Sequence, residues 1–167
     1  NLNVARREAD IAIRLARPAS GDFLIRKLAE VGFALYGAAR GELAVSAGDW
    51  VAYNEDLDHT PEMRRLHAML GDGRIRLRSN SLRGLVRAVA GGIGHGLLPC
   101  FVADADPGLI RLSGAEPILH RELWMLIHPD ARPLARVAAT ADWLVERFDA
   151  EAASFAGRTP SPRAAPP

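Results

Sequence analysis

The residues best suited to bind a ligand lie in one stretch, residues 79–99, with the sequence SNSLRGLVRAVAGGIGHGLLP. It begins with Ser79, Asn80 and Ser81, whose side-chain oxygens can each accept a hydrogen bond from a free backbone N–H at a helix start. A polar loop that opens a helix also presents unpaired N–H groups, which favour a carboxylate or another anion. The stretch therefore predicts ligand binding, and it holds no nucleophile beside a base.

A short helix and a turn must position this loop. The apolar residues after the loop keep the i, i+3, i+4, i+7 spacing of one helix face: Leu82, Leu85, Val86 and Val89. Two glycines, residues 91–92, end the predicted helix, and residues 93–99 turn into a short apolar strand.

The turn itself is a second candidate for ligand contact. Gly94, His95 and Gly96 are expected to form a cleft wall, because backbone without bulky side chains lets a ligand approach closely. The alternative is a tight helix-to-strand turn that needs glycine for its backbone geometry, with His95 facing solvent.

A third candidate follows the apolar strand predicted over residues 9–15. Arg14 lies near its carboxyl end, where open α/β sheets bind ligands, and a guanidinium suits a carboxylate. A surface arginine without a ligand explains the residue equally well. Arg14 and Ala16 are therefore the predicted contacts on this side.

Apolar strands alternate with helical segments along the chain. Further strands are predicted over residues 31–37, 50–53, 74–78, 109–112 and 123–127. A helix is predicted from Thr60-Pro61 to Gly71 with Thr60 as its cap, and a longer one over residues 134–148. This alternation predicts an α/β fold with a largely parallel sheet. The tail, residues 156–167, is rich in proline and small residues and is expected to be disordered.

Composition excludes several classes of protein. The chain has 167 residues, 49% of them hydrophobic, which suffices for one domain or two small lobes. A net charge of +1 gives no global field that would recruit nucleic acid or a membrane. No apolar run is long enough to cross a bilayer and no export leader is recognisable, so a cytoplasmic location is expected. Cys100 is the single cysteine, and we expect it to be a small buried hydrophobe.

Other polar residues have simpler explanations than a site. The arginines of RIRLR (74–78) alternate as on the solvent face of a strand, with no aromatic residues between them for nucleic-acid stacking. The five histidines show no metal-ligand spacing, and Asp104 and Asp106 fit a turn. Trp124 is expected in the core or at a dimer interface.

Five segments, in order and sensibly spaced, resemble one known family. They are EADIAIRL (8–15), RKLAEVGFALYG (26–37), RLRSNSLRGLVRAVAGGIGHGLLP (76–99), PGLIRL (107–112) and RELWMLIHPDARPLARVAATADWL (121–144). Together they resemble the effector-binding domain of LysR-type transcriptional regulators, over about residues 8–150.

This resemblance implies a fold similar to type 2 periplasmic binding proteins, with two α/β lobes, two crossover strands and a small effector in the cleft between the lobes. Residues 1–37 and 120–155 would form an incomplete first lobe with the crossovers, and residues 38–119 the second lobe. An incomplete lobe is expected to expose apolar sheet edges.

The resemblance also implies partners. A small, anionic effector is expected, with no cofactor, no metal and no catalysis, and subunits are expected to pair through these domains. DNA would be bound only through a winged helix-turn-helix, which in the family precedes this domain and is absent from the sequence. Two alternatives share the fold: an exported solute-binding protein, and, less favoured, an enzyme with acid and base residues at the cleft, where only His95 is a candidate.

Overall fold

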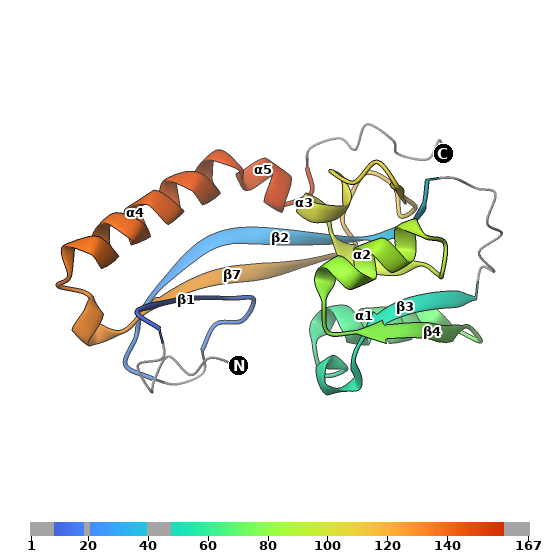
Figure 1. Ribbon diagram of the computed structural model, residues 1–167, viewed down its shortest axis with the longest axis horizontal. Helices are drawn as coiled ribbons and strands as arrows, with labels where there is room; N and C mark the ends of the chain where they lie inside the picture. Colours follow the sequence, from blue (N-terminus) through green and yellow to red (C-terminus); the bar gives the residue numbers. More distant parts are fainter. Residues whose placement is uncertain (1–8, 19–20, 40–47, 159–167) are drawn as a thin grey trace.

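The structure, a computed structural model, describes residues 9–18, 21–39 and 48–158. It has two halves that are joined by two long strands, β2 and β7 (Figure 1). We call them the α4 half, which contains β1 and α4, and the β3–β4 half, which contains β3 to β6 and α1 to α3. The predicted division into lobes at residues 38 and 119 stays a prediction.

The bounds of the elements are as follows. The strands are β1 (Ile11–Arg14), β2 (Leu24–Ala38), β3 (Asp49–Tyr53), β4 (Arg74–Ser79), β5 (Gly96–Pro99), β6 (Leu109–Arg111) and β7 (Leu119–Ile127). The α-helices are α1 (Pro61–Leu70), α2 (Leu82–Ala90), α3 (Cys100–Ala103), α4 (Ala135–Ala150) and α5 (Ala152–Phe155). Two 3₁₀ turns, η2 (Glu55–Leu57) and η3 (Pro129–Ala131), complete the described chain.

The larger sheet is antiparallel. Its order is β1-β7-β2-β5, with β6 also paired to β2, and each of these pairs runs antiparallel. Only β3 and β4 form a parallel pair of strands, so the prediction of a largely parallel sheet is wrong for the described strands. The reason is topological: β2 leaves the α4 half and β7 returns to it, so these neighbours must run in opposite directions.

Strand β2 is the longest of the described strands and runs from one half to the other. Its apolar run was predicted over residues 31–37, and there the side chains of Val31, Phe33, Ala34 and Tyr36 are buried. Consecutive buried residues mean that both faces of the strand are covered, as expected for a strand between two layers. At the other edge of the sheet, β1 leaves Ile13 42% exposed, in line with the expected apolar edge.

Local sequence signals explain the helices. Helix α4 turns Val137 and Ala141 onto Leu28 and Met125, so its predicted apolar face is confirmed. Thr60 precedes α1, but its side chain makes no capping hydrogen bond, and its buried hydroxyl oxygen has no partner among the described residues. The prediction of a capping threonine is therefore wrong. The prediction that the helix begins with Pro61 at its first position is confirmed.

The structure also tests the predictions for Cys100 and for the tail. Cys100 is fully buried, as predicted for a small hydrophobe. The predicted disordered tail starts too early, because Ala156 is buried and the Arg158 N–H donates to the carbonyl of Ala153. Residues 159–167 lie outside the described residues.

Candidate functional site

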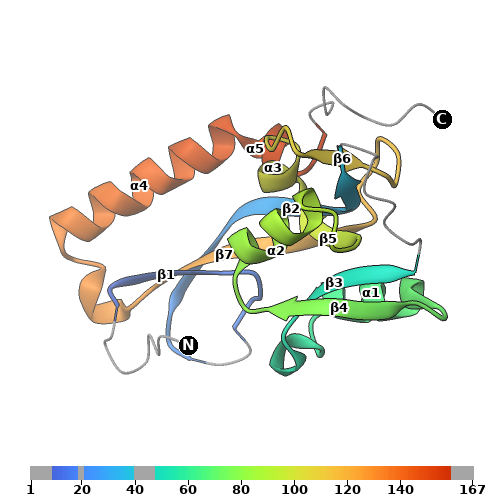
Figure 2. The same ribbon diagram turned by 45° about the vertical axis from the view of Figure 1, so that its right-hand side comes forward.

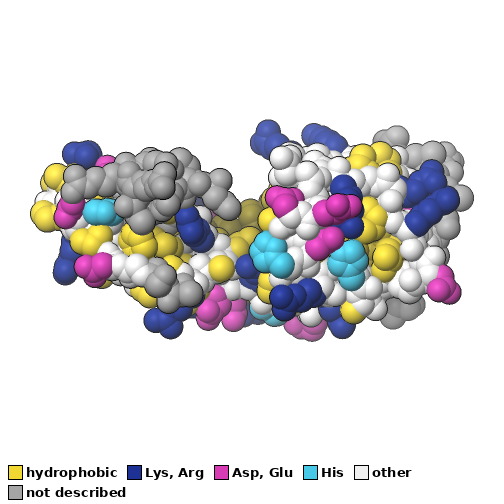
Figure 3. Space-filling view, turned by 90° about the horizontal axis from the view of Figure 1, so that it is seen from below, with side chains coloured by type: hydrophobic (Ala, Val, Ile, Leu, Met, Phe, Trp, Pro, Cys, Tyr) yellow, Lys and Arg dark blue, Asp and Glu magenta, His cyan; other side chains and the backbone are white. Residues whose placement is uncertain are grey.

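The two halves face each other at the carboxyl ends of three strands. Tyr53 and Ser79, the last residues of the parallel strands β3 and β4, are register partners. Opposite them lies the carboxyl end of β1, which faces the start of α2 in both Figure 1 and Figure 2. Seen from below, the surface is hollowed between the two halves (Figure 3). Carboxyl ends of strands that meet at such a position are the usual place for a ligand in α/β proteins.

The loop at residues 79–81 is arranged as a cluster of hydrogen-bond donors. Ser81 caps α2, because its Oγ accepts from the Gly84 N–H at 3.3 Å, which confirms the predicted cap. Ser79 Oγ accepts from the Ser81 N–H at 3.1 Å. Both hydroxyls are thus used as acceptors, so each keeps its own proton to donate to a further acceptor. Asn80 and Ser81 are exposed and can be reached from solvent.

The β1 side supplies positive charge. Arg14, the last residue of β1, is exposed and is the register partner of Trp124 on β7. The guanidinium of Arg17 lies 5.3 Å from the ring centre of Trp124, a cation–π contact that favours this position. Ala16 lies between these arginines and is exposed. Trp124, expected in a core or a dimer interface, is half-buried and serves as a platform for Arg17.

Arg121 connects the two sides. From β7, its Nη2 donates to the carbonyl of Leu15 at 2.7 Å, and its Nη1 donates to both carboxylate oxygens of Glu62 at 2.8 Å. Leu15 follows β1, whereas Glu62 lies in the first turn of α1 in the other half. Sequence reasoning missed this pair. The sign available in the sequence was a carboxylate, Glu62, next to Met63, whose side chain is buried in the core. A carboxylate in such a position needs a charged partner.

The phenol of Tyr53 adds a neutral donor. Burial, and then the negative charge of Glu62, raise the pKa of Tyr53 to about 12, while Arg121 opposes the shift. Tyr53 therefore keeps its proton at neutral pH. Its position beside Ser79 in the register places the residue at the same end of the β3–β4 half as the serine loop, with Glu62 and Arg121 near its phenol.

The structure does not bring Gly94, His95 and Gly96 to this site. The His95 N–H donates to the carbonyl of Asp49 and its carbonyl accepts from Val51, so the turn pairs with the amino end of β3. His95 is bridged to Trp50, three residues before Tyr53, which corresponds to roughly 10 Å along a strand. This placement supports the alternative of a tight structural turn.

The glycines of that turn have a packing reason. A Cβ at Gly94 would lie 2.8 Å from the backbone of Asp49 and Trp50. At Gly96, a Cβ would lie 2.8 Å from Val89 of α2. His95 is partly buried against Trp50, and this burial lowers the pKa of its imidazole.

The described part of the chain offers few other sites. No group of three or more histidine, cysteine, aspartate or glutamate side chains in it is placed to hold a metal ion. None of the described helices has the length and apolar character needed to span a bilayer. Asp104 lies in a turn, as expected, and it also pairs with the buried Arg111, a contact that sequence reasoning missed.

Comparisons with known proteins agree on one family. A family model described as the LysR substrate binding domain matches residues 2–149. The Mau operon transcriptional activator of Paracoccus denitrificans is 35% identical over 153 residues, which are 89% of this chain and 52% of that protein. The chain therefore spans about half the length of this curated relative.

Solved structures show the same fold. CrgA, a LysR-type transcriptional regulator from Neisseria meningitidis, has a TM-score of 0.68 and 19% identity, over 87% of this chain and 54% of that chain. The CcmR regulatory domain of Synechocystis PCC6803, solved in complex with 2-PG, has a TM-score of 0.64 and 15% identity, over 86% of this chain and 76% of that chain. The predicted fold class, similar to type 2 periplasmic binding proteins, is confirmed.

Proposed function

This chain belongs to the LysR substrate-binding domain family, and on that premise we propose that its site binds a small anionic effector between the two halves. The effector is held on one side by Ser79, Asn80 and Ser81 and on the other by the loop that follows β1, with Arg14 and Ala16. The domain senses this molecule for a bacterial transcriptional regulator and performs no catalysis.

One observation supports the proposal that the effector is an anion. Ser79 and Ser81 both use their oxygens to accept local N–H groups, so that two hydroxyl protons remain to meet an acceptor. They sit at the start of α2, where the helix dipole favours negative charge, and face a segment with two arginines. A carboxylate satisfies all of these groups, whereas a cation would be repelled. The regulatory domain of Synechocystis CcmR, which shares this fold, was solved with a small molecule, 2-PG.

The mechanism is a shift between arrangements of the two halves. An effector that touches both sides binds most tightly when they are close, so it favours the closed arrangement by the difference between its two affinities. In the whole regulator, subunits pair through these domains and pass this change to a winged helix-turn-helix that contacts DNA. The regulator works in the cytoplasm, without membrane, metal or cofactor.

The test is a ligand screen by thermal unfolding of the 167-residue chain. The panel holds small mono- and dicarboxylates and inorganic phosphate, with neutral sugars as controls. A ligand at 100 times its Kd raises the free energy of unfolding by about 2.7 kcal/mol, which is readily measured. We expect at least one anion to stabilise the chain and no neutral sugar to do so. Stabilisation by the sugars alone would contradict the anionic class.

A double variant tests the site. Ser79→Ala/Ser81→Ala removes both hydroxyl protons, and the anion-induced shift in Tm is expected to disappear. Thr140→Ala is the matched control, because Thr140 is an exposed hydroxyl on α4 that donates to the carbonyl of Arg136, far from the serine loop. An unchanged shift in the double variant would show that the effector binds elsewhere.

A further inference from the structure

The chain after α4 leaves the α4 half. Helix α5 and the residues after it lie over strand β2 and reach α3 of the β3–β4 half (Figure 1). We call residues 155–157 the strap. Its contacts fall into four groups, which involve the joining strands, the aromatic side chains, a buried arginine and the thiol of Cys100.

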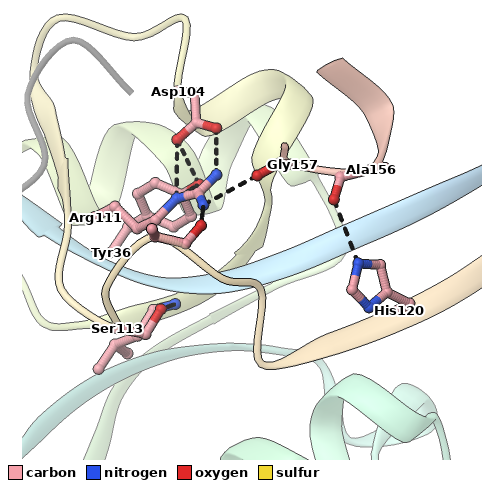
Figure 4. Close-up of polar contacts among 9 residues, drawn as sticks. Tyr36, Asp104, Arg111, Ser113, His120, Ala156 and Gly157 are labelled. Carbon is pink, nitrogen blue, oxygen red and sulfur yellow. Dashed lines mark hydrogen bonds and ion pairs between the residues drawn. The ribbon is translucent and has the colours of Figure 1, made fainter. Parts of the chain in front are cut away.

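The strap lies on the joining strands at one register pair. Gly32 of β2 and His120 of β7 are partners, and Ala156 is seated above them with 1% of its surface exposed. His120 Nε2 lies 3.3 Å from the Ala156 carbonyl oxygen (Figure 4). A Cβ on Gly32 would lie 2.6 Å from the same oxygen, so this position needs glycine to let the strap approach. Such a close backbone contact fixes where the strap sits.

Aromatic stacking connects the two halves through the strap. The ring centre of Phe155 lies 4.6 Å from that of Phe101 on α3 and 4.8 Å from that of Phe148 on α4. Both distances fall in the range of favourable aromatic pairs. Phe155 therefore packs at the same time on an element of each half.

Arg111 anchors the end of the strap. Its side chain is 2% exposed, and its Nη1 donates to the Gly157 carbonyl at 3.2 Å (Figure 4). On the other edge, the guanidinium pairs with the carboxylate of Asp104, and Tyr36 Oη donates to Asp104 Oδ1 at 2.7 Å. A buried charge needs such a full set of partners, and the strap carbonyl is one of them.

The strap also covers the thiol of Cys100. Gly157 has a φ of +68°, and a Cβ there would lie 2.7 Å from Cys100 Sγ. The thiol has no exposed surface, and Cys100 is the sole cysteine of the chain. The strap therefore covers one side of a thiol whose other neighbours belong to the core, Tyr36 among them.

We propose that residues 155–157 act as an intramolecular clasp, which fastens α4 to the β3–β4 half across the joining strands and thereby limits how far the two halves move. The clasp acts whatever molecule binds between the halves, so it does not rest on the proposed effector. When the strap detaches, the halves gain freedom and the Cys100 thiol becomes accessible.

The first test measures the reaction of Cys100 with Ellman's reagent. A chain that ends at Ala150 lacks the strap, whereas a chain that ends at Arg158 keeps it and serves as the matched control. We expect the thiol to react about tenfold faster without the strap, because local opening governs access to buried groups. The control should react at the rate of the full chain. Equal rates in both truncated chains, with the folded circular dichroism spectrum retained, would overturn the proposal.

A point variant keeps this test valid if the shorter chain unfolds. Gly157→Ala places a Cβ against Cys100, whereas Gly114→Ala has a comparable φ of +82° with open space around its Cβ. Only the first is expected to speed up thiol modification. If both variants leave the rate unchanged, the strap does not cover Cys100.

The second test measures the freedom of the two halves. Spin labels at Arg65→Cys on α1 and Asp142→Cys on α4, in a Cys100→Ala background, report the distance between the halves. Removal of the strap is expected to widen the distance distribution about twofold, since only the joining strands and the contacts of Arg121 with Leu15 and Glu62 then hold the halves together. A distribution of unchanged width would show that the strap does not restrain them.

Discussion

Glu62 and Arg121 are 59 positions apart in the chain, yet one nitrogen of Arg121, Nη1, lies 2.8 Å from both carboxylate oxygens of Glu62. Both side chains are largely buried. Loss of one partner leaves the other as a buried, uncompensated charge. Glu62→Gln and Arg121→Met should therefore each lower the free energy of unfolding by about 3–5 kcal/mol in urea denaturation. The double variant should cost less than the sum of the two, and additive costs would show that the pair does not interact.

The cap of α2 gives a smaller, local prediction. Ser81→Ala removes the acceptor of the Gly84 N–H and should lower the free energy of unfolding by about 1 kcal/mol, whereas Ser81→Gly should cost only a few tenths. Asn80→Ala is the control next to it and is expected to be nearly neutral. Chemical denaturation of the three variants checks this order. A neutral Ser81→Ala would mean that the capping bond adds nothing to stability.

The close approach at Gly94 predicts a larger effect. Gly94→Ala forces a Cβ into the backbone of Asp49 and should cost about 1–3 kcal/mol, as overpacking does. Gly91→Ala, where the nearest atom to the new Cβ is 3.1 Å away, is the milder control. Thermal unfolding of both variants measures the difference. Equal Tm values would contradict the packing role of Gly94.

His95 predicts a pH dependence of stability. Burial lowers the pKa of His95 below its ordinary value of 6.5, and Asp49 only partly opposes this shift. As the pH falls below 6.5, the unfolded chain takes up the proton before the folded chain does. Protonation thus favours the unfolded state, and stability decreases toward acid pH. His95→Gln should reduce the loss in free energy of unfolding between pH 7 and pH 5, and an identical pH profile would contradict the assignment.

The sequence predicted those features that depend only on neighbouring residues. The spacing of apolar residues gave α2 and α4, and the serine before Leu82 gave the cap, because each depends on neighbours within a turn or two. The fold class was what the resemblance of five such segments to a known family implied. In the structure, Ser79–Ser81 and the end of β1 lie on opposite halves and face each other.

Long-range pairing accounts for what was not predicted. The direction of the sheet depends on how β2 meets β7, about 90 positions later, and no local period encodes that meeting. Arg111 pairs with Asp104 and with Gly157, 46 residues away, so an arginine within an apolar strand was the only local sign of the network. His95 and its neighbouring glycines lie against β3, and sequence alone does not predict this because a glycine-rich turn has the same composition whether it binds a ligand or packs on another strand.

The pairing of β2 with β7 has a mechanical consequence. The two strands are hydrogen-bonded from Leu24 and Ile127 to Phe33 and Leu119, so the halves are joined by one ribbon and not by two separate threads. Bending a ribbon in its own plane stretches the ladder of hydrogen bonds, whereas twisting it keeps every pair in register, and two-stranded ribbons twist readily. We therefore expect the two halves to change their relative angle more readily than to shift within the plane of this ribbon.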